Sequence, residues 1–464
     1  MEQIVIEPKI KNTILAGRHE EFEWSRVKDT PVLIKPKDHD LPKILDNFQY
    51  SVGAWPIILE EDKIDTVKKL SARIPRLIKR IPELYFKNDQ KRIADYYFNG
   101  DEMLAQFAML CHSKNVDVGC RLDLMYSEGG FKLIEVNVGS TIGGWQVQVL
   151  EEMIRQYHPQ LNDPVTASKY ESPDTQAVYI EFLVDSIMKH IKPTDSEANV
   201  FFGVGHIDSD ENKKEVLSFF DNLLNKELAK RGLKGRSHTG KYSSLVMKNG
   251  RLYCGDKPMH SVIAFKTEID DPIPPDVFRA FIMDEIYFPD NLTHGMTEDK
   301  RNLEILRSLA EEKAFSEEDN ALILNHIPWS SEIVHKQVQY AGKTQSVEDV
   351  LRTHKEQMVI KDAMGYQGID VFVGKFATNE EWEKAIQLAF SEKNFLAQEF
   401  NESIDYLAPN LQKEWTDHKI VWGSFGFGDN YGGVCARVSE VKTDVGIINC
   451  ARGAVVAIVY ELKK

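Results

Sequence analysis

The feature that most constrains this chain is a pair of alternating segments joined by a glycine turn, within residues 121–145. The first segment, RLDLMY, alternates charged and apolar side chains, and the second, FKLIEVNV, does so again after Ser-Glu-Gly-Gly. Alternation with a period of two is typical of β-strands, and glycines between two such runs favour a hairpin turn. The sequence therefore predicts an antiparallel β-hairpin in this region.

Four polar side chains of this hairpin are expected to share one face. Glu135 and Asn137 are two residues apart on the second strand, so they point to the same side. Arg121 and Asp123 have the same spacing on the first strand, and they join that face if the strands pair near the turn. Carboxylate and amide oxygens suit Mg²⁺. The alternative is an exposed hairpin with one solvated face, and the pattern alone leaves both open.

Composition excludes several classes of protein. The chain has 464 residues, which is enough for about two or three domains of ordinary size. Charged residues make up 28% and hydrophobic residues 42%, as in soluble globular proteins. The formal net charge of −15 disfavours nucleic acids and anionic membranes as partners. No apolar run approaches the roughly 20 residues that span a bilayer.

The cysteines and the N-terminal residues indicate the compartment. None of the five cysteines stands at C-x-x-C spacing from another, which disfavours a disulfide framework or a zinc ribbon. The N-terminal residues show no basic segment followed by an apolar run, so we expect no secretion signal there. These patterns favour a reducing compartment, and we expect a cytoplasmic protein.

Periodicity along the chain predicts a mixed architecture, α+β or α/β. Residues 61–115 carry apolar side chains at helical spacing, and we expect Pro75 and Pro82 to interrupt the helix. Residues 195–270 alternate strand and helix patterns, so we expect an α/β unit there. Apolar strands separated by glycines follow again near the C-terminus.

A second candidate site is a lysine followed by a glycine loop. In VIKDAMGYQGIDVFVG, Lys361 ends an apolar strand, and Gly365 and Gly368 lie in the loop before the next strand. Backbone amides of such a loop can approach phosphate oxygens while the ammonium group neutralises their charge. The loop is not a Walker A motif, because the G-x-x-x-x-G-K order is absent. The alternative is an ordinary hairpin with glycines at its turn.

Other short patterns are less specific. Gln398 and Glu399 interrupt the apolar strand FLAQEF, where they could bind a nucleotide base or ribose or simply mark a strand edge. Gly203 and Gly205 lack the third glycine of a dinucleotide fingerprint, so we expect no such site there. The histidines include no H-E-x-x-H motif, which disfavours a zinc hydrolase.

Taken together, these motifs resemble the circularly permuted ATP-grasp family, in particular its glutathionylspermidine-synthase-like branch. The resemblance covers roughly residues 100 to 464. That branch carries an R-x-D strand followed by E-x-N, which the hairpin matches with Arg121, Asp123, Glu135 and Asn137. In ordinary ATP-grasp chains the lysines of the lid come first and the metal-binding acids last. The hairpin here precedes the glycine loop, which is the order of the permuted branch.

The same resemblance implies roles for residues outside the hairpin. Lys300 and Lys361 match two lysines that hold ATP phosphates, and Gly365 and Gly368 match the glycine-rich lid loop. The family's hinge pair, which contacts adenine, is matched by Gln398 and Glu399. A late G-G-x-x-x-R segment of the family is matched by residues 432–437.

The resemblance implies an ATP-dependent carboxylate–amine ligase with a circularly permuted ATP-grasp fold and a smaller lid domain. Asp123, Glu135 and Asn137 are then the Mg²⁺ ligands, and Arg121 stabilises the transferring phosphoryl group. A small-molecule or peptide carboxylate is joined to an amine through an acyl phosphate, with release of ADP and phosphate. No nucleic acid or membrane partner is expected. Whether the protein forms a homodimer is left open. Two alternatives also stay open: an ATP-grasp enzyme that forms a thioester, an ester or a phosphorylated product, and a non-catalytic pseudo-ligase that binds nucleotide.

Five regions are expected along the chain. A helix-rich N-terminal region covers residues 1–120, and the metal-binding hairpin with its following core helices covers 121–195. An α/β domain covers 196–300, the lid domain 301–400, and C-terminal core strands 401–464. The sequence names neither the acid nor the amine.

Overall fold

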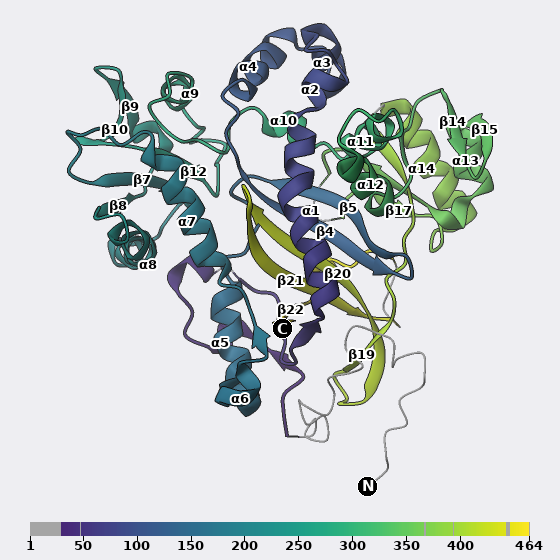
Figure 1. The fold of residues 1–464 in the computed structure, drawn as a ribbon, viewed down its shortest axis with the longest axis horizontal. Helices are drawn as coiled ribbons and strands as arrows, with labels where there is room; N and C mark the ends of the chain where they lie inside the picture. The colour runs from purple at the N-terminus through teal and green to yellow at the C-terminus, as the bar shows by residue number, and fades with distance from the viewer. Residues whose placement is uncertain (1–28, 47, 366–367, 393, 442–445, 464) are drawn as a thin grey trace.

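The centre of the protein is a large mixed β-sheet (Figure 1), seen in a computed structural model that describes residues 29–46, 48–365, 368–392, 394–441 and 446–463. The strands run in the order β1-β2-β22-β21-β20-β4-β5, with β3 and β6 added at β22 and β19 at β20. Their bounds are β1 Leu33–Ile34, β2 Val52–Gly53, β3 Ile57–Leu59, β4 Gly119–Ser127, β5 Gly130–Val138, β6 Tyr170–Glu171, β19 Tyr406–Pro409, β20 Trp415–Phe427, β21 Asn430–Glu440 and β22 Val455–Leu462. The hairpin β4–β5 therefore pairs with the C-terminal strands, as β4 lies directly beside β20.

Helix α1 (Glu61–Lys79) crosses one face of this sheet (Figure 1). Its buried side chains follow helical spacing, and they belong to the same core as the apolar residues of β4 and β5. The buried apolar residues of the helix are Ile64, Val67, Leu70, Ile74, Leu77 and Ile78. Since α1 covers the apolar side of the hairpin, the polar side of the hairpin faces away from it.

The expectation that Pro75 interrupts this helix is wrong. The helix continues through Pro75 to Lys79, and the break comes before α2 (Ile81–Leu84), in which Pro82 occupies the first turn. A proline inside a helix leaves the carbonyl four residues earlier without its usual donor. That carbonyl belongs to Ser71, and the thiol of Cys120 lies 3.9 Å from it as a weak donor. Burial of the apolar face of α1 against the sheet offsets the lost backbone bond.

The other helices of the N-terminal part flank the central sheet. Helices α3 and α4 follow α2 and lie together at one end of the molecule, beyond the end of α1 (Figure 1). Helices α5 and α7 follow the hairpin, and α7 packs on β20 and β21. The bounds are α3 Gln90–Tyr97, α4 Glu102–His112, α5 Val147–Tyr157, α6 Pro164–Ala167 and α7 Thr175–Met188.

Residues 198–282 form the predicted α/β unit. Three parallel strands run in the order β12-β7-β8, and α8 connects β7 to β8. A separate antiparallel sheet has the order β11-β10-β9. The bounds are β7 Ala198–Gly203, α8 Asp210–Ala229, β8 Gly235–His238, β9 Leu245–Lys248, β10 Arg251–Cys254, β11 Lys257–Pro258, β12 Ser261–Ala264 and α9 Pro275–Ile282. The alternation of strand and helix that the sequence predicts there is confirmed.

Residues 330–399 form a smaller unit with its own hydrophobic core. Its sheet has the order β13-β18-β16-β17, and a hairpin of β14 and β15 lies beside it. Short helices α10 to α12 lead into this unit. The bounds are α10 His294–Thr297, α11 Asn302–Glu311, α12 Glu317–His326, β13 Ser330–Glu332, β14 Gln337–Tyr340, β15 Lys343–Ser346, α13 Val347–Thr353, β16 Met358–Asp362, β17 Val371–Val373, α14 Asn379–Glu392 and β18 Phe395–Glu399.

The mixed α/β class that the sequence predicts is confirmed by these sheets and helices. Among the described residues, no helix is both long and apolar enough to cross a membrane. The five cysteines are all free thiols, in agreement with the absence of a disulfide pattern. The limits predicted for the five regions of the chain stay predictions.

Candidate functional site

The hairpin brings its four polar residues together, and a bulge in the second strand sets the register that does so. Arg121 on β4 pairs directly with Asn137 on β5, and Asp123 pairs with Glu135. The register shifts between Asp123 and Leu124, which leaves Ile134 as an extra residue on β5. This bulge sits next to the polar pairs, a position in which bulges often re-aim side chains.

Asp123 is held between two arginines. Its Oδ1 lies 2.8 Å from Nε of Arg121, and its Oδ2 lies 2.7 Å from Nη2 of Arg437 on β21. Burial acts to raise the pKa of the carboxyl group, but the two guanidinium groups outweigh it and hold the pKa well below its usual range. Asp123 is therefore ionised and fixes both arginines in place.

A glycine makes this arrangement sterically feasible. Gly423 lies on β20 between the two neighbouring strands, where it pairs with Asp123 on one side and with Cys435 on the other. A β-carbon at this position would stand 3.0 Å from Cδ of Arg121 and 3.1 Å from the carbonyl oxygen of Cys435. The missing side chain thus leaves room for Arg121 above β20, and Arg437 can reach Asp123 across the same strand.

Lys300 joins the hairpin from the segment that precedes α11. Its Nζ lies 3.3 Å from Oε1 of Glu135 and 2.5 Å from the carbonyl oxygen of Gly365. Its backbone N–H donates to the carbonyl of Ala363 at 3.0 Å. The lysine therefore links the hairpin of the large sheet to the glycine loop of the smaller unit, although these segments are far apart in the sequence.

Lys361 lies behind this link, on β16, and is almost fully buried. Its Nζ donates to Oε1 of Gln398 at 2.7 Å and to the carbonyl of Ile134 at 3.3 Å. Burial lowers the pKa of Lys361 to about 8, and the nearby Lys300 acts in the same direction. Lys361 is thus mostly protonated at neutral pH but loses its proton at a lower pH than an ordinary lysine.

A cavity of about 640 Å³ opens beside these groups. The predicted residues Arg121, Glu135, Asn137, Lys300 and Gly365 line it, whereas Asp123 lies behind its arginines. The other predicted residues do not line this cavity, namely Lys361, Gly368, Gln398 and Glu399. The structure therefore groups the hairpin, Lys300 and Gly365 at one cavity and places the second lysine with Gln398 just outside it.

The remaining two predicted residues lie at the edge of the smaller unit. Glu399 accepts a long hydrogen bond from the hydroxyl of Tyr340 at 3.4 Å. The carbonyl of Gly368 accepts from Nη2 of Arg452 at 2.8 Å. Arg452 belongs to a 3-10 turn at Cys450–Arg452, and Cys450 itself lines the cavity. The glycine loop is therefore tied to the C-terminal segment that borders the cavity.

The wall of the cavity carries more cationic than anionic side chains. Arg121, Lys300 and Arg437 line it, against Glu135 and Glu298. Burial raises the pKa of Glu298 above its usual range. Because the whole chain has a net charge of −15, this positive wall is a local exception. Such a wall attracts an anion such as a phosphate group.

Of the three predicted metal ligands, Glu135 and Asn137 line this cavity. Asn137 donates to the carbonyl of Arg121 through Nδ2 at 3.3 Å, a contact that does not use its amide oxygen. Within the described ranges, no three His, Cys, Asp or Glu residues form a group that could hold a metal by themselves. Mg²⁺ commonly takes only one or two protein oxygens and completes its shell with water and substrate phosphates. Two hard oxygen donors on a cavity wall fit that ion.

Several lining residues were not predicted as site residues from the sequence. Arg437 is the most important of them, because it shares Asp123 with Arg121. The G-G-x-x-x-R segment at residues 432–437 ends on this arginine, but no pattern paired Arg437 with Asp123. Glu298, Asn449 and Cys450 come from loops without periodicity, so only the folded chain identifies them.

Comparisons with known proteins define the fold and not the activity. No family model matches this chain, and no curated protein does. A solved structure of a glutathione synthetase-like effector from Globodera pallida, in its apo form, aligns with a TM-score of 0.54 and 13% identity. The alignment covers 98% of this chain and 99% of that one. The chain thus shares the fold of a glutathione synthetase-like protein over nearly its whole length.

A second structure is more distant. A candidate γ-glutamylcysteine synthetase from Methylobacillus flagellatus KT aligns with a TM-score of 0.39 and 12% identity, over 84% of this chain and 88% of that one. A likeness at this level does not support an argument about fold or function.

Proposed function

We propose that this protein is an ATP-dependent ligase that joins a carboxylate to an amine and releases ADP and phosphate. The observation that carries the proposal is the cationic wall of the 640 Å³ cavity, which sits in an acidic chain and includes two hard oxygen donors. The shared fold with a protein described as a glutathione synthetase-like effector supports it. The R-x-D and E-x-N spacing of the hairpin supports the same assignment.

In this proposal the fold is a circularly permuted ATP-grasp fold. The hairpin β4–β5 and the strands β20 to β22 form its core, and residues 330–399 form the lid. The contact of Lys300 with both Glu135 and Gly365 supports this division, because it joins core and lid at the cavity. Gln398 and Glu399 stand at the hinge of the lid, where they can contact the adenine.

The cationic groups bind and orient the phosphates of ATP. Lys300 reaches the cavity directly, and Lys361 reaches it when its ammonium group leaves Gln398. Arg121 neutralises charge on the γ-phosphoryl group as it transfers, because its guanidinium group is already fixed by Asp123 and the carbonyl of Ile142. Arg437 is fixed by the same carboxylate and can orient the substrate carboxylate.

Mg²⁺, when bound, neutralises phosphate charge and aligns the γ-phosphoryl group for transfer. Glu135 and Asn137 are the residues that would hold it. Asp123 stays a predicted ligand, but one of its oxygens would first have to leave an arginine. In the arrangement seen here, Asp123 acts on the cavity through Arg121 and Arg437.

The proposed reaction has two steps. A carboxylate oxygen attacks the γ-phosphorus, and the bond from that phosphorus to the bridging oxygen of ADP breaks. The neutral amine then attacks the carbonyl carbon of the acyl phosphate. The new C–N bond replaces the C–O bond to phosphate, and the amine releases one proton. Closure of the cavity excludes water, which would otherwise hydrolyse the acyl phosphate.

The test is a screen of carboxylates and amines for stimulated release of ADP from Mg·ATP. We expect ADP and phosphate to appear only with a particular acid, and an amide to accumulate when the amine is added. Release of AMP and pyrophosphate would overturn the acyl-phosphate mechanism. If the final product is a thioester, an ester or a phosphorylated acid, the cavity catalyses another reaction. If no acid supports turnover, the ligase proposal is contradicted.

A further inference from the structure

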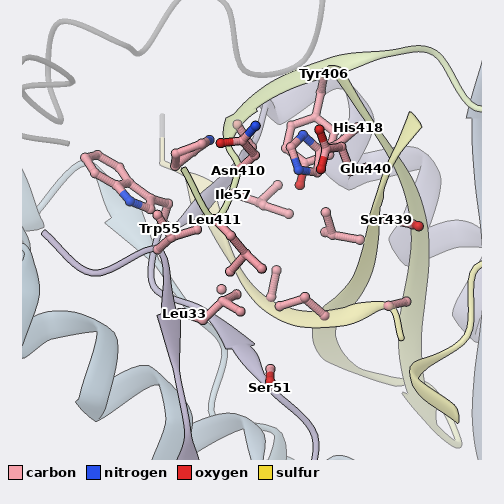
Figure 2. Close-up of a pocket in the computed structure, with 18 of the residues that line it drawn as sticks. Leu33, Ser51, Trp55, Ile57, Tyr406, Asn410, Leu411, His418, Ser439 and Glu440 are labelled. Atoms are coloured by element: carbon pink, nitrogen blue, oxygen red, sulfur yellow. The ribbon is translucent and has the colours of Figure 1, made fainter. Parts of the chain in front are cut away.

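A second cavity lies next to the proposed ATP site, and its lining is mainly apolar and aromatic. Its volume is about 430 Å³, within the range of small-molecule sites of about 300–1,000 Å³. It lies between the segment around β2 and β3 and the strands β19 to β22. Figure 2 shows Trp55, Leu33, Ile57 and Leu411 on one side and a group of polar side chains near Tyr406 at one end. Such a lining suits a ligand with an apolar body and a polar end.

The polar end includes Glu440 (Figure 2) and three buried side chains that each keep one atom available. The hydroxyl of Tyr406 and Nε2 of His418 have no hydrogen-bond partner among the described residues, and neither has Nδ2 of Asn410. The three residues are only 5–7% exposed. The three residues line the cavity, so the free polar atoms are available to bond a ligand that enters it.

The chemistry of these atoms defines what the ligand must offer. Nδ1 of His418 donates to the carbonyl of Thr416 at 2.9 Å, and burial lowers the pKa of this histidine, so Nε2 is an acceptor near neutral pH. Burial raises the pKa of Tyr406, whose hydroxyl stays protonated and can donate. Oδ1 of Asn410 accepts from two backbone N–H groups, which leaves Nδ2 as a donor. A hydroxyl or an amide on the ligand satisfies both kinds of partner.

The second cavity adjoins the first at two residues. Tyr50 and Cys450 line both cavities. Among the described residues, strands β21 and β22 pair over residues 435–438 and 455–458. Beyond the last pair they separate, and Ser439 and Ala454 then line the second cavity. A ligand in this cavity can therefore direct one end past Cys450 towards the proposed acyl phosphate.

We propose that this second cavity binds the body of the amine substrate, which is a primary amine on an aromatic or branched aliphatic group with a distal hydroxyl or amide. The amino group lies at the Tyr50–Cys450 boundary, and the distal polar group lies at Tyr406, His418 and Asn410. This inference rests on the proposed ligase function and adds the class of the acceptor to it.

The experiment compares three amines with the acid that the ADP screen identifies. Tyramine has an aromatic body and a hydroxyl, phenethylamine has the body alone, and ethanolamine has no apolar body. We expect the KM to be lowest for tyramine and highest for ethanolamine. Tyr406→Phe should raise the KM for tyramine about fivefold, the typical effect of losing one neutral hydrogen bond. The KM for phenethylamine, which has no hydroxyl, should stay unchanged.

A second variant blocks the cavity. Ala408 lies on β19 and lines the cavity, so Ala408→Trp should raise the KM for both aromatic amines by about tenfold or more, in the range that pocket shape gives for apolar groups. The KM for ATP and the acid-dependent release of ADP should stay unchanged in both variants. Tyr253→Phe, on β10 outside both cavities, is the matched control and should change nothing.

The outcomes separate this inference from the ligase proposal. If ADP and amide form but the three amines have equal KM values that neither variant changes, the second cavity does not bind the amine and the ligase proposal still stands. If no acid stimulates ADP release in the wild-type protein, the ligase proposal is overturned and the amine assignment with it.

Discussion

Two aspartates of this protein are held by arginines, yet their surroundings differ. Asp123 lies between Arg121 and Arg437 at the wall of the 640 Å³ cavity. Asp195 forms a two-bond pair with Arg251, at 2.7 and 2.9 Å, and accepts from Nε2 of His260 at 2.9 Å. In both places arginine lowers the pKa of the carboxyl group against the effect of burial.

The difference lies in what the cationic partners can still reach. Arg251 donates two of its N–H groups to Asp195, and Nδ1 of His260 accepts from the backbone N–H of Asn199 at 2.8 Å. Neither of these partners lines either of the two cavities described above. Arg121 and Arg437 line the larger cavity while they hold Asp123. A shifted pKa therefore does not identify a functional site unless the charged partners also face a cavity.

We call the group around Asp123 the open cluster and the group around Asp195 the closed cluster. The largest expected effect is on turnover, when the open cluster is changed. Glu135→Ala should lower turnover by at least about 10³, because it removes a proposed ligand of the ion that clamps the phosphates. Stability should change by less than about 1 kcal/mol, because the Glu135 side chain is partly exposed and Lys300 keeps the carbonyl of Gly365 as a partner. Steady-state kinetics with the identified acid and a thermal melt measure the two quantities. Near-normal turnover, or an unfolded variant, would show that the hairpin has only a structural role, and the two clusters would then not differ in function.

Arg251→Ala should have the opposite profile at the closed cluster. It leaves the partly buried Asp195 with a weaker set of partners, so the free energy of unfolding should fall by about 1–3 kcal/mol. Turnover per folded molecule should be that of the wild type. Chemical denaturation and kinetics below the melting temperature test both statements. A variant that keeps its stability but loses turnover would mean that the closed cluster belongs to the catalytic machinery.

Arg121→Ala should separate binding from chemistry at the open cluster. We expect turnover to fall by about 10²–10³, the usual loss for one charge-stabilising donor, while the affinity for Mg·ADP stays roughly intact. Arg437 remains beside Asp123 in this variant, so the carboxylate keeps one ion pair. Calorimetric titration with Mg·ADP and single-turnover kinetics give the two values. Loss of nucleotide affinity without a further loss of turnover would assign Arg121 to binding alone.

The smallest expected effect concerns pH. Lys361 has a pKa lowered to about 8, so its ammonium group is present below this pH and is lost as the pH rises through it. The affinity for Mg·ADP should therefore fall above about pH 8, by several-fold at most, since bound phosphates raise the pKa again. Titrations between pH 6.5 and 9.5 measure it, and Lys361→Met should bind more weakly with no such step. A step of equal size in Lys361→Met would assign the titration to another group.

The sequence predicted the parts of this molecule that local patterns determine. Period-two alternation predicted the hairpin, because side chains on a strand alternate between faces. The pairing of Arg121 with Asn137 also depends on the bulge at Ile134, which shifts the register by one residue and which the alternation did not predict. Lys300 and Gly365 were predicted separately, and the fold brings them together through a contact across 65 residues. Propensity failed at Pro75, where the burial of α1 outweighs the cost of a missing backbone bond.

The sequence could not show the features that depend on distant segments. Arg437 reaches Asp123 across β20, and this contact depends on sheet order and on Gly423 rather than on any spacing. The second cavity combines residues near Trp55 with residues near Tyr406, which no window of sequence contains together. Gln398 was predicted at the nucleotide, but its amide oxygen accepts from Lys361, and its role at the hinge stays a prediction.

The central claim is that a carboxylate attacks the γ-phosphate of ATP at the open cluster. The most direct measurement uses the identified acid labelled with oxygen-18 in its carboxylate and follows the label by mass spectrometry of the released phosphate. The account predicts that one labelled oxygen passes from the acid to phosphate in each turnover, and that Glu135→Ala abolishes this transfer. Phosphate without label, formed while the amide accumulates, would contradict the acyl phosphate and with it the function assigned to this cavity.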